Sequence, residues 1–338
     1  MPLLATVDDA RFEGHRAPSP HPERPERLIA ARDGLEAALG GCARRPLPPR
    51  RARREELSLV HDPAYLDRLE ARLGAGCGSM DPDTYICEGS EEAVMLAAGG
   101  AIGLAEHLLL GSGGRGLALL RPPGHHATPS GAMGFCLLNN IALGAACALE
   151  AGAERVAIVD WDVHHGNGTE EAFYDDPRVL FVSTHQWPLY PGTGRPGDHG
   201  VGAGRGSTMN IALPEGTGPA AMGEAFRTLI LPKLGAFSPE LILVSCGFDA
   251  HRDDPLGGLA LDASCFGAMT SALVEEAERL GHGRVGLILE GGYDLAAIEA
   301  STQAVVGALL GAAVPLPTGP LRAEEAEALA ATRRIHGL

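Results

Sequence analysis

The segment RVAIVDWDVHHGNG, residues 155–168, decides the fold class and raises the question of function. Its first part, residues 155–160, is a continuous apolar run ending in an aspartate, a pattern typical of a strand buried on both faces of a parallel sheet. The part that follows places two acidic side chains and two adjacent histidines within six positions, 160–165. Such a run is either a metal-binding segment or the salt-bridged, hydrogen-bonded end of a buried strand.

Apolar runs of the same kind recur along the chain, and helical patterns lie between them. Alternating strands and helices predict an α/β fold with a parallel sheet. The expected strands are residues 116–120, 155–160, 179–184, 241–246 and 284–290, and the expected helices are residues 90–111, 136–151, 218–235, 262–280 and 295–312.

Composition limits the classes of function. The chain has 338 residues, 45% of them apolar and 21% charged, as in ordinary globular proteins. Its net charge of −16 repels phosphates, so we expect no nucleic-acid partner. We also expect no signal peptide and no uninterrupted apolar stretch of membrane length. The seven cysteines are scattered without a CxxC pair, which predicts a reduced, cytoplasmic protein.

Two long loops are expected. Residues 41–56, GCARRPLPPRRARREE, are basic and Pro-rich, and we predict a solvated surface loop there. Residues 185–208 are rich in Gly and Pro and follow an expected strand directly. Because long loops without secondary structure are usually functional or disordered, we predict that this second loop forms part of a site.

Each expected strand is followed by polar residues that a simple turn does not need. Ligands of open parallel sheets bind outside the carboxyl ends of the strands, so these residues predict one shared crevice. The segments are RPPGHHA (121–127), DWDVHHGNG (160–168), HQ (185–186), GFDAHRDDP (247–255) and GGYD (291–294).

A metal site is the sharpest prediction from these segments. If the backbone stays extended past residue 160, the side chains of Asp160, Asp162 and His164 share one face. One carboxylate and one imidazole from this face can bind a single ion, with Asp249 as the best candidate for a third ligand. A catalytic zinc site has three protein ligands and one open position.

The remaining polar residues fit acid–base chemistry. His125 and His126 form a second histidine pair, and histidine is the usual general base. Asp160 and Asn167 are available to orient their rings. The hydroxyl of Tyr293 can stabilise a developing oxyanion. Taken singly, each of these side chains could instead have only a structural role.

Nine motifs, taken together in order, resemble the histone deacetylase family of the arginase/deacetylase fold, over about residues 8–310. The resemblance implies a single domain over residues 1–338, with three α/β/α layers around a central parallel sheet, a core of about 8–313 and a C-terminal helix within 321–338. Asn167 is similar to the class II branch. The motifs are HPERPERL (21–28), HDPAYLDRL (61–69), DTYICEGSEEA (83–93), RPPGHHA, GFCLLNN (134–140), VDWDVHHGNGTE (159–170), HQWPLYPGTG (185–194), GFDAHRDDPLGG (247–258) and EGGYDL (290–295).

The resemblance also implies roles for individual residues. His126 is expected to be the general base and then the general acid, beside His125, and Tyr293 to polarise the amide carbonyl. Asn167 in place of an acidic partner implies a lower pKa for His126. The other implied residues are the zinc ligands Asp162, His164 and Asp249; Asp160 behind His125; the tunnel residues Gly134, Phe135, Tyr190 and Leu256; a structural potassium site at Asp160, Asp162, His164, Ser183 and Thr184; and Arg27 in an internal cavity.

The expected activity is zinc-dependent hydrolysis of acetyl-lysine side chains or of a small acylated amine. An acetylpolyamine amidohydrolase with the same zinc chemistry is the main alternative. Leu256 stands where polyamine-selective relatives carry an acidic residue, whereas Asp83 or Glu88 at the tunnel mouth would favour a cationic substrate.

The oligomeric state stays open between a monomer and a homo-oligomer. Two further alternative functions are weaker. An arginase-like two-metal site needs a carboxylate at His251, which is absent. A non-catalytic acyl-lysine binding module would be expected to have lost a ligand, a histidine of the pair or Tyr293, and all of these are present.

Overall fold

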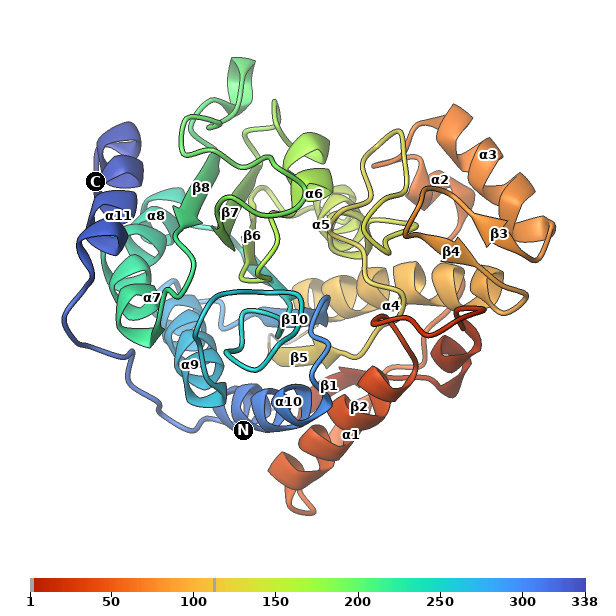
Figure 1. Ribbon diagram of the computed structural model, residues 1–338, viewed down its shortest axis with the longest axis horizontal. Coiled ribbons are helices and arrows are strands. Elements are labelled where there is room, and N and C mark those ends of the chain that lie inside the picture. Colours follow the sequence, from red (N-terminus) through yellow and green to blue (C-terminus); the bar gives the residue numbers. More distant parts are fainter. Residues whose placement is uncertain (1–2, 112–113) are drawn as a thin grey trace.

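The computed structural model describes residues 3–111 and 114–338, so residues 1–2 of the expected domain lie outside the described part (Figure 1). Its centre is an eight-stranded sheet in the order β2-β1-β5-β10-β9-β6-β7-β8, and every neighbouring pair is parallel. The strands are β1 (Leu4–Val7), β2 (Arg44–Pro46), β5 (Arg115–Ala118), β6 (Val156–Asp160), β7 (Val179–Gln186), β8 (Thr208–Leu213), β9 (Leu241–Cys246) and β10 (Val285–Leu289).

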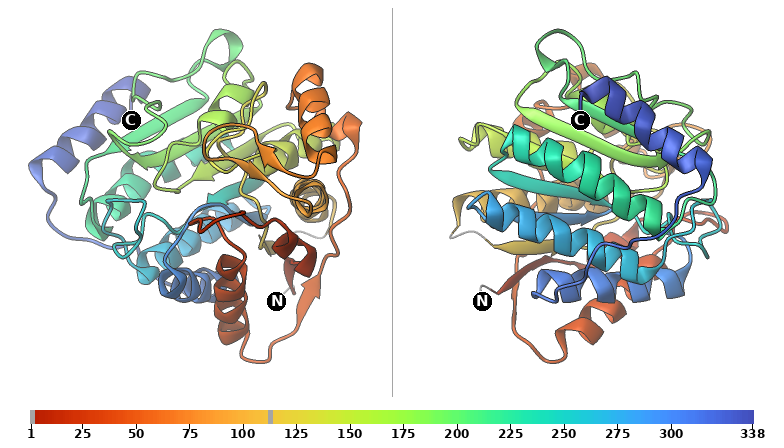
Figure 2. Two further views of the ribbon diagram at one scale, coloured as in Figure 1. Left: turned by 45° about the vertical axis from the view of Figure 1, so that its right-hand side comes forward. Right: turned by 90° about the vertical axis from the view of Figure 1, so that its left-hand side faces the viewer.

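Helices cover both faces of this sheet, which gives the expected three layers (Figure 2). α4 and α5 pack together on one face. α9 and α10 lie on the other, where α1 packs against α10. The helices are α1 (Glu26–Leu39), α2 (Arg54–Leu57), α3 (Pro63–Gly74), α4 (Ser90–Leu110), α5 (Asn140–Glu150), α6 (Asn167–Ala172), α7 (Pro219–Ala225), α8 (Leu231–Phe237), α9 (Ala263–Arg279), α10 (Leu295–Leu309) and α11 (Ala323–His336).

All five predicted strands are present, and four of them, β6, β7, β9 and β10, are buried along their whole length. Continuous apolar runs identify such strands well because both faces must be covered by helices. The predicted helix over 218–235 is interrupted by a π-helical turn at Phe226–Ile230 between α7 and α8. The C-terminal helix expected within 321–338 is α11, which packs against β8.

Five strands of the described part of the chain were not predicted: β1, β2 and β8 of the central sheet, and β3 (Gly78–Ser79) and β4 (Tyr85–Ile86), which form a separate two-stranded antiparallel sheet. The loop prediction for residues 41–56 is partly wrong. That segment contains the edge strand β2 and the short helix α2. β2 reads Arg-Arg-Pro, so it has no apolar run by which to recognise it. The second loop prediction holds better: residues 185–186 belong to β7 and residue 208 to β8, while the chain between them forms no further strand.

α4 bears on the expectation that no uninterrupted apolar stretch reaches membrane length, and its apolar run is bounded by Glu91, Glu92 and Glu106. This helix has 21 residues and a mean hydropathy of 1.7 in its most apolar window, so by length and composition alone it could cross a membrane. In the fold, 72% of that window is buried. α4 is the core helix that packs on α5 and the central strands, and this packing accounts for its apolar surface.

Candidate active site

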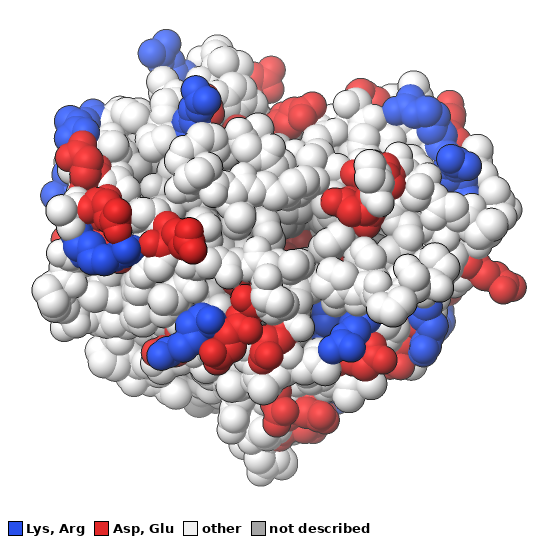
Figure 3. Space-filling view, viewed as in Figure 1, with Lys and Arg blue, Asp and Glu red and all other residues white. Residues whose placement is uncertain are grey.

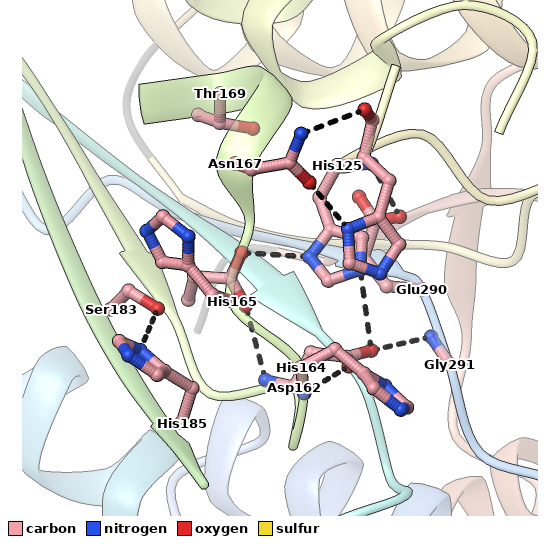
Figure 4. Close-up of polar contacts among 12 residues, drawn as sticks. His125, Asp162, His164, His165, Asn167, Thr169, Ser183, His185, Glu290 and Gly291 are labelled. Carbon is pink, nitrogen blue, oxygen red and sulfur yellow. Dashed lines mark hydrogen bonds and ion pairs between the residues drawn. The ribbon is translucent and has the colours of Figure 1, made fainter. Parts of the chain in front are cut away.

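Four of the five polar segments predicted to meet lie at the carboxyl ends of neighbouring strands. Figure 4 shows residues of three of them, His125, Asp162 with His164, and Gly291. Asp160 ends β6, and the segment carrying Asp249 follows the adjacent β9. Tyr293 follows β10, and the histidine pair follows β5, the next strands of the sheet. The order β5-β10-β9-β6 therefore places four chemically active segments side by side.

The candidate metal centre consists of Asp162, His164 and Asp249, whose ligand atoms all lie within 4.8 Å of one another. His164 Nδ1 lies 3.1 Å from Asp162 Oδ1 and 3.2 Å from Asp249 Oδ2. Both carboxylates are fully buried. These are the three residues predicted from the sequence as ligands, and the fold brings them together.

The geometric basis of that prediction needs a correction. β6 ends at Asp160, and the backbone bends over residues 162–164 instead of continuing as a strand. The Asp160 carboxylate accepts the N–H of Asp162 at 3.1 Å, and the Asp162 carboxylate accepts the N–H of His164 at 3.0 Å. Successive aspartate turns therefore gather the side chains, where strand alternation was expected to do so.

The donor set fits one divalent cation. Asp249 Oδ2 is buried and, within the described part of the chain, accepts no hydrogen bond of acceptable geometry, although His164 Nδ1 lies 3.2 Å from it. Burial and the charge of Asp162 raise the pKa of Asp249 to about 7, so a cation between these carboxylates would relieve an unfavourable pair. Two carboxylates and one imidazole with room for a further ligand suit a catalytic zinc ion.

Backbone groups orient the two carboxylates from behind. Gly291 N–H donates to Asp162 Oδ2 at 2.9 Å, and Val163 N–H donates to Asp249 Oδ1 at 2.8 Å. A Cβ on Gly291 would lie 2.1 Å from Asp249 Oδ2 and 2.5 Å from Asp162 Oδ2, so no larger residue fits at this place. The paired glycines of EGGYDL thus have a packing role beside the metal centre, in addition to turning the chain.

The two histidines of RPPGHHA have different partners. Nδ1 of His125 lies 2.9 Å from Asp160 Oδ2, and Nδ1 of His126 lies 2.8 Å from Asn167 Oδ1. Burial lowers the pKa of His125, but the charges of Asp162 and Asp160 outweigh it and raise that pKa to about 10. Burial and the neighbouring imidazoles hold the pKa of His126 well below its usual range. Such opposed pKa values suit a pair with divided acid–base roles.

A cavity of about 170 Å³ leads to these groups. Gly134 lies against the His126 ring, where a Cβ would come within 2.5 Å, and both Gly134 and Phe135 have positive φ. All four predicted tunnel residues line the cavity, as do Asp83, which had been named as a possible residue of the tunnel mouth, and Leu189, which had not been predicted. The full lining is Asp83, His126, Gly134, Phe135, His164, Leu189, Tyr190, Leu256 and Tyr293.

The other predicted residues also lie near the centre. Ser183 pairs with Asp160 in the sheet, and the Thr184 hydroxyl donates to the Asp160 carbonyl at 3.3 Å. Arg27 is fully buried, with its guanidinium 4.9 Å from the centroid of the Tyr293 ring. Glu88 is exposed and does not line the cavity.

Two buried carboxylates were missed. Glu290 accepts the N–H groups of Gly124 and His125, at 2.6 and 3.1 Å. Asp254 accepts the N–H of Tyr293 at 2.6 Å. Glu290 lies in the EGGYDL motif and Asp254 in the GFDAHRDDPLGG motif. An acidic residue at the end of an apolar run, as Glu290 is, was the available signal.

Comparisons with known proteins agree with this geometry. A family model described as "Histone deacetylase domain" matches residues 21–309. The probable deacetylase of Archaeoglobus fulgidus is 43% identical over 300 residues, which cover 88% of this chain and 83% of that protein. The histone deacetylase-like amidohydrolase of Pseudomonas aeruginosa is 40% identical over 317 residues, 92% of this chain and 81% of that protein. The crystal structure of the HDA15 HD domain superposes with a TM-score of 0.92 at 38% identity, covering 99% of this chain and 96% of that one.

Proposed function

The chain belongs to the histone deacetylase family, a family of hydrolases, and from this we propose that it cleaves acyl amides with one zinc ion, acetyl-lysine side chains being the preferred substrates. The observation that carries the proposal is the triad of Asp162, His164 and Asp249, of which His164 lines a cavity together with His126 and Tyr293. The cavity therefore gives a substrate access to a candidate metal ligand, to a histidine base and to a hydroxyl donor, the groups that a metal-assisted hydrolase needs.

Asp162, His164 and Asp249 would hold the ion. When bound, zinc supplies the Lewis acidity that lowers the pKa of a water molecule to about 7. His126 uses Nδ1 to bind Asn167, which leaves Nε2 to take the proton of the attacking water and return it to the departing amine. Asp160 holds the neighbouring His125 ring through its Nδ1.

Tyr293 would donate a hydrogen bond to the carbonyl oxygen of the scissile amide as negative charge develops there. Burial raises the pKa of its hydroxyl well above the usual value, so the phenol keeps its proton and can donate. Phe135 and Tyr190 line the same cavity, and their rings suit the uncharged stem of an acyl-lysine.

One observation favours a second candidate, an acetylpolyamine amidohydrolase. Asp83 lines the cavity, so a carboxylate does reach the space that a substrate amine would approach. Leu256, on the same cavity, is uncharged and favours an acyl-lysine stem. Asp83 therefore favours a polyamine and Leu256 favours acetyl-lysine. We place acetyl-lysine first because Asp83 is partly exposed, and solvent screens its charge.

The test is amide hydrolysis by the purified protein on an acetyl-lysine peptide and on N-acetylputrescine, each with and without a zinc chelator. We expect chelator-sensitive turnover of the peptide and slower turnover of N-acetylputrescine. Preference for N-acetylputrescine would replace the substrate assignment and leave the zinc chemistry standing. Turnover that survives complete removal of zinc would contradict the proposed mechanism.

The remaining expectations stay predictions. They include a potassium ion near Asp160, Ser183 and Thr184, a cytoplasmic location and a possible homo-oligomeric state. All seven cysteines are free thiols, consistent with a reducing compartment. On the face shown in Figure 3, basic side chains are interspersed with acidic ones and form no broad basic surface of the kind that nucleic acids bind.

A further inference from the structure

Two loops that wall the acyl cavity are held by one buried carboxylate, Asp254. It lies in the segment after β9 and is 6% exposed. Its Oδ2 accepts the backbone N–H groups of Tyr293 at 2.6 Å and Asp294 at 3.2 Å. Its Oδ1 accepts the N–H of Leu256 at 3.0 Å. Both carboxylate oxygens are therefore used, one for each loop.

In the Tyr293 loop, the peptide group between Gly292 and Tyr293 is hydrogen-bonded through both its carbonyl and its N–H. Arg27 Nε donates to the carbonyl of Gly292 at 2.5 Å, while Asp254 accepts the N–H of Tyr293 in the same peptide. Gly292 has a φ of 113°, and a Cβ there would lie 3.0 Å from the Cβ of Phe248. With the peptide plane fixed, the Tyr293 ring has little freedom except rotation about its own side-chain bonds.

The Leu256 side fixes the opposite loop. Leu256 lies two residues after Asp254, and its N–H bonds back to that carboxylate in an aspartate turn. Leu256 and Tyr293 both line the 170 Å³ cavity. A shift of either loop would change the width of the cavity near the phenol that the mechanism uses.

We propose that Asp254 is a positioning residue that sets the places of Tyr293 and Leu256 together, and so links the rate of amide cleavage to the choice of acyl group. The inference rests on the proposed function, which makes Tyr293 the carbonyl donor. Asp254 itself reaches no substrate atom, because it is absent from the cavity lining and its bonds go to backbone N–H groups.

Replacing Asp254 by Asn and by Ala should distinguish its effect on the Leu256 loop from its effect on the Tyr293 loop. An amide has one acceptor oxygen, so Asp254→Asn can serve only one side. We expect the oxygen to face the two donors of Tyr293 and Asp294, leaving the NH₂ group against the N–H of Leu256. Asp254→Ala removes the acceptors for both loops. Asp253→Asn is the matched control, because the neighbouring Asp253 side chain is 66% exposed.

Kinetics on acetyl-lysine and butyryl-lysine peptides give the first readout. For Asp254→Asn we expect the ratio of the two kcat/KM values to change by at least ~3-fold, with kcat on the acetyl peptide within ~3-fold of wild type. For Asp254→Ala we expect kcat to fall by roughly 10- to 100-fold, because buried N–H donors lose their partners. Asp253→Asn should match wild type in both quantities.

Amide hydrogen–deuterium exchange gives a second readout that needs no turnover. Asp254→Asn should speed exchange ~10-fold in peptides spanning residues 255–258 and leave those spanning 292–296 nearly unchanged, whereas Asp254→Ala should speed both. If Asp254→Asn retains wild-type exchange and acyl preference, the positioning role is wrong even when the enzyme is active. If the wild type hydrolyses neither peptide, the proposed substrate fails, and exchange alone still decides whether Asp254 holds both loops.

Discussion

The inner end of the active-site cavity and its mouth are formed by different parts of the fold. The inner end consists of residues at or just after strand ends, and Asp162, Asp249 and Asp160 are all fully buried there. The mouth consists of loop residues, among them Tyr190, which is 39% exposed. Strand ends are placed by the whole sheet, whereas loops are placed by a few local contacts. We infer that the chemistry is fixed rigidly and that substrate choice is the adjustable part.

The largest effect should come from the inner end. Replacing Asp249 by Ala removes one of the three proposed metal ligands and leaves His164 beside a single carboxylate. We expect bound zinc to be lost and kcat/KM to fall by ~10³-fold or more, since the metal supplies several kcal/mol of charge stabilisation. Zinc content by mass spectrometry and hydrolysis rates on the same preparation check this. A variant that keeps its full zinc content would show that Asp249 is no ligand, and high activity without zinc would contradict the zinc-dependent mechanism.

The next effect concerns the phenol. Tyr293→Phe should lower kcat by roughly 10²- to 10³-fold, the usual cost of losing one oxyanion donor, and should leave zinc content unchanged. The ring remains, so its packing against Phe135 and under Arg27 is preserved. An unchanged kcat would remove Tyr293 from the mechanism, and loss of zinc would point to a structural role instead.

A pH effect should follow from the partner of His126. The general base must be neutral to accept a proton, so the rate rises as pH passes upward through its pKa. Asn167→Asp would place a negative charge against Nδ1, which favours the protonated ring and raises the pKa of His126. The acidic limb of the kcat/KM profile should therefore move to higher pH. A limb that stays in place would contradict the assignment of His126 as the base.

The smallest effect is expected at the mouth. Asp83→Asn removes the carboxylate that lines the cavity and should lower the preference for N-acetylputrescine over the acetyl-lysine peptide by about 2- to 5-fold, as suits a partly exposed charge. Leu256→Glu should change the same ratio in the opposite direction. If either substitution changed zinc content, the division between a rigid inner end and an adjustable mouth would be wrong.

The residues at the inner end of the cavity could be predicted from the sequence more completely than those at its mouth. Buried parallel strands are continuous apolar runs, so their polar ends stand out, and the residues of the metal centre and the histidine pair could be named in advance. The turns that gather Asp162 and His164 were not foreseen, because side-chain bonds to backbone N–H groups leave no periodic pattern. Leu189 was missed for a related reason: only the path of a long loop places it on the cavity.

The strands and buried carboxylates that were not predicted also lack a local sequence pattern. β1 and β2 are short, and β2 carries arginines and a proline at the sheet edge, so neither shows a long apolar run. Asp254 and Glu290 lie far in sequence from several of the N–H groups that they accept, such as those of Tyr293 and Gly124. Tertiary contacts of this kind become visible only once the strand order is known.

We propose that Asp162, His164 and Asp249 bind one zinc ion and that amide cleavage depends on this ion. The most direct measurement is a titration of the metal-free protein with zinc, in which bound metal per chain and hydrolysis of an acetyl-lysine peptide are followed together. The account predicts that activity rises in proportion to bound zinc and reaches its maximum at one ion per chain. A maximum at two ions per chain, or full activity before any zinc is added, would contradict it.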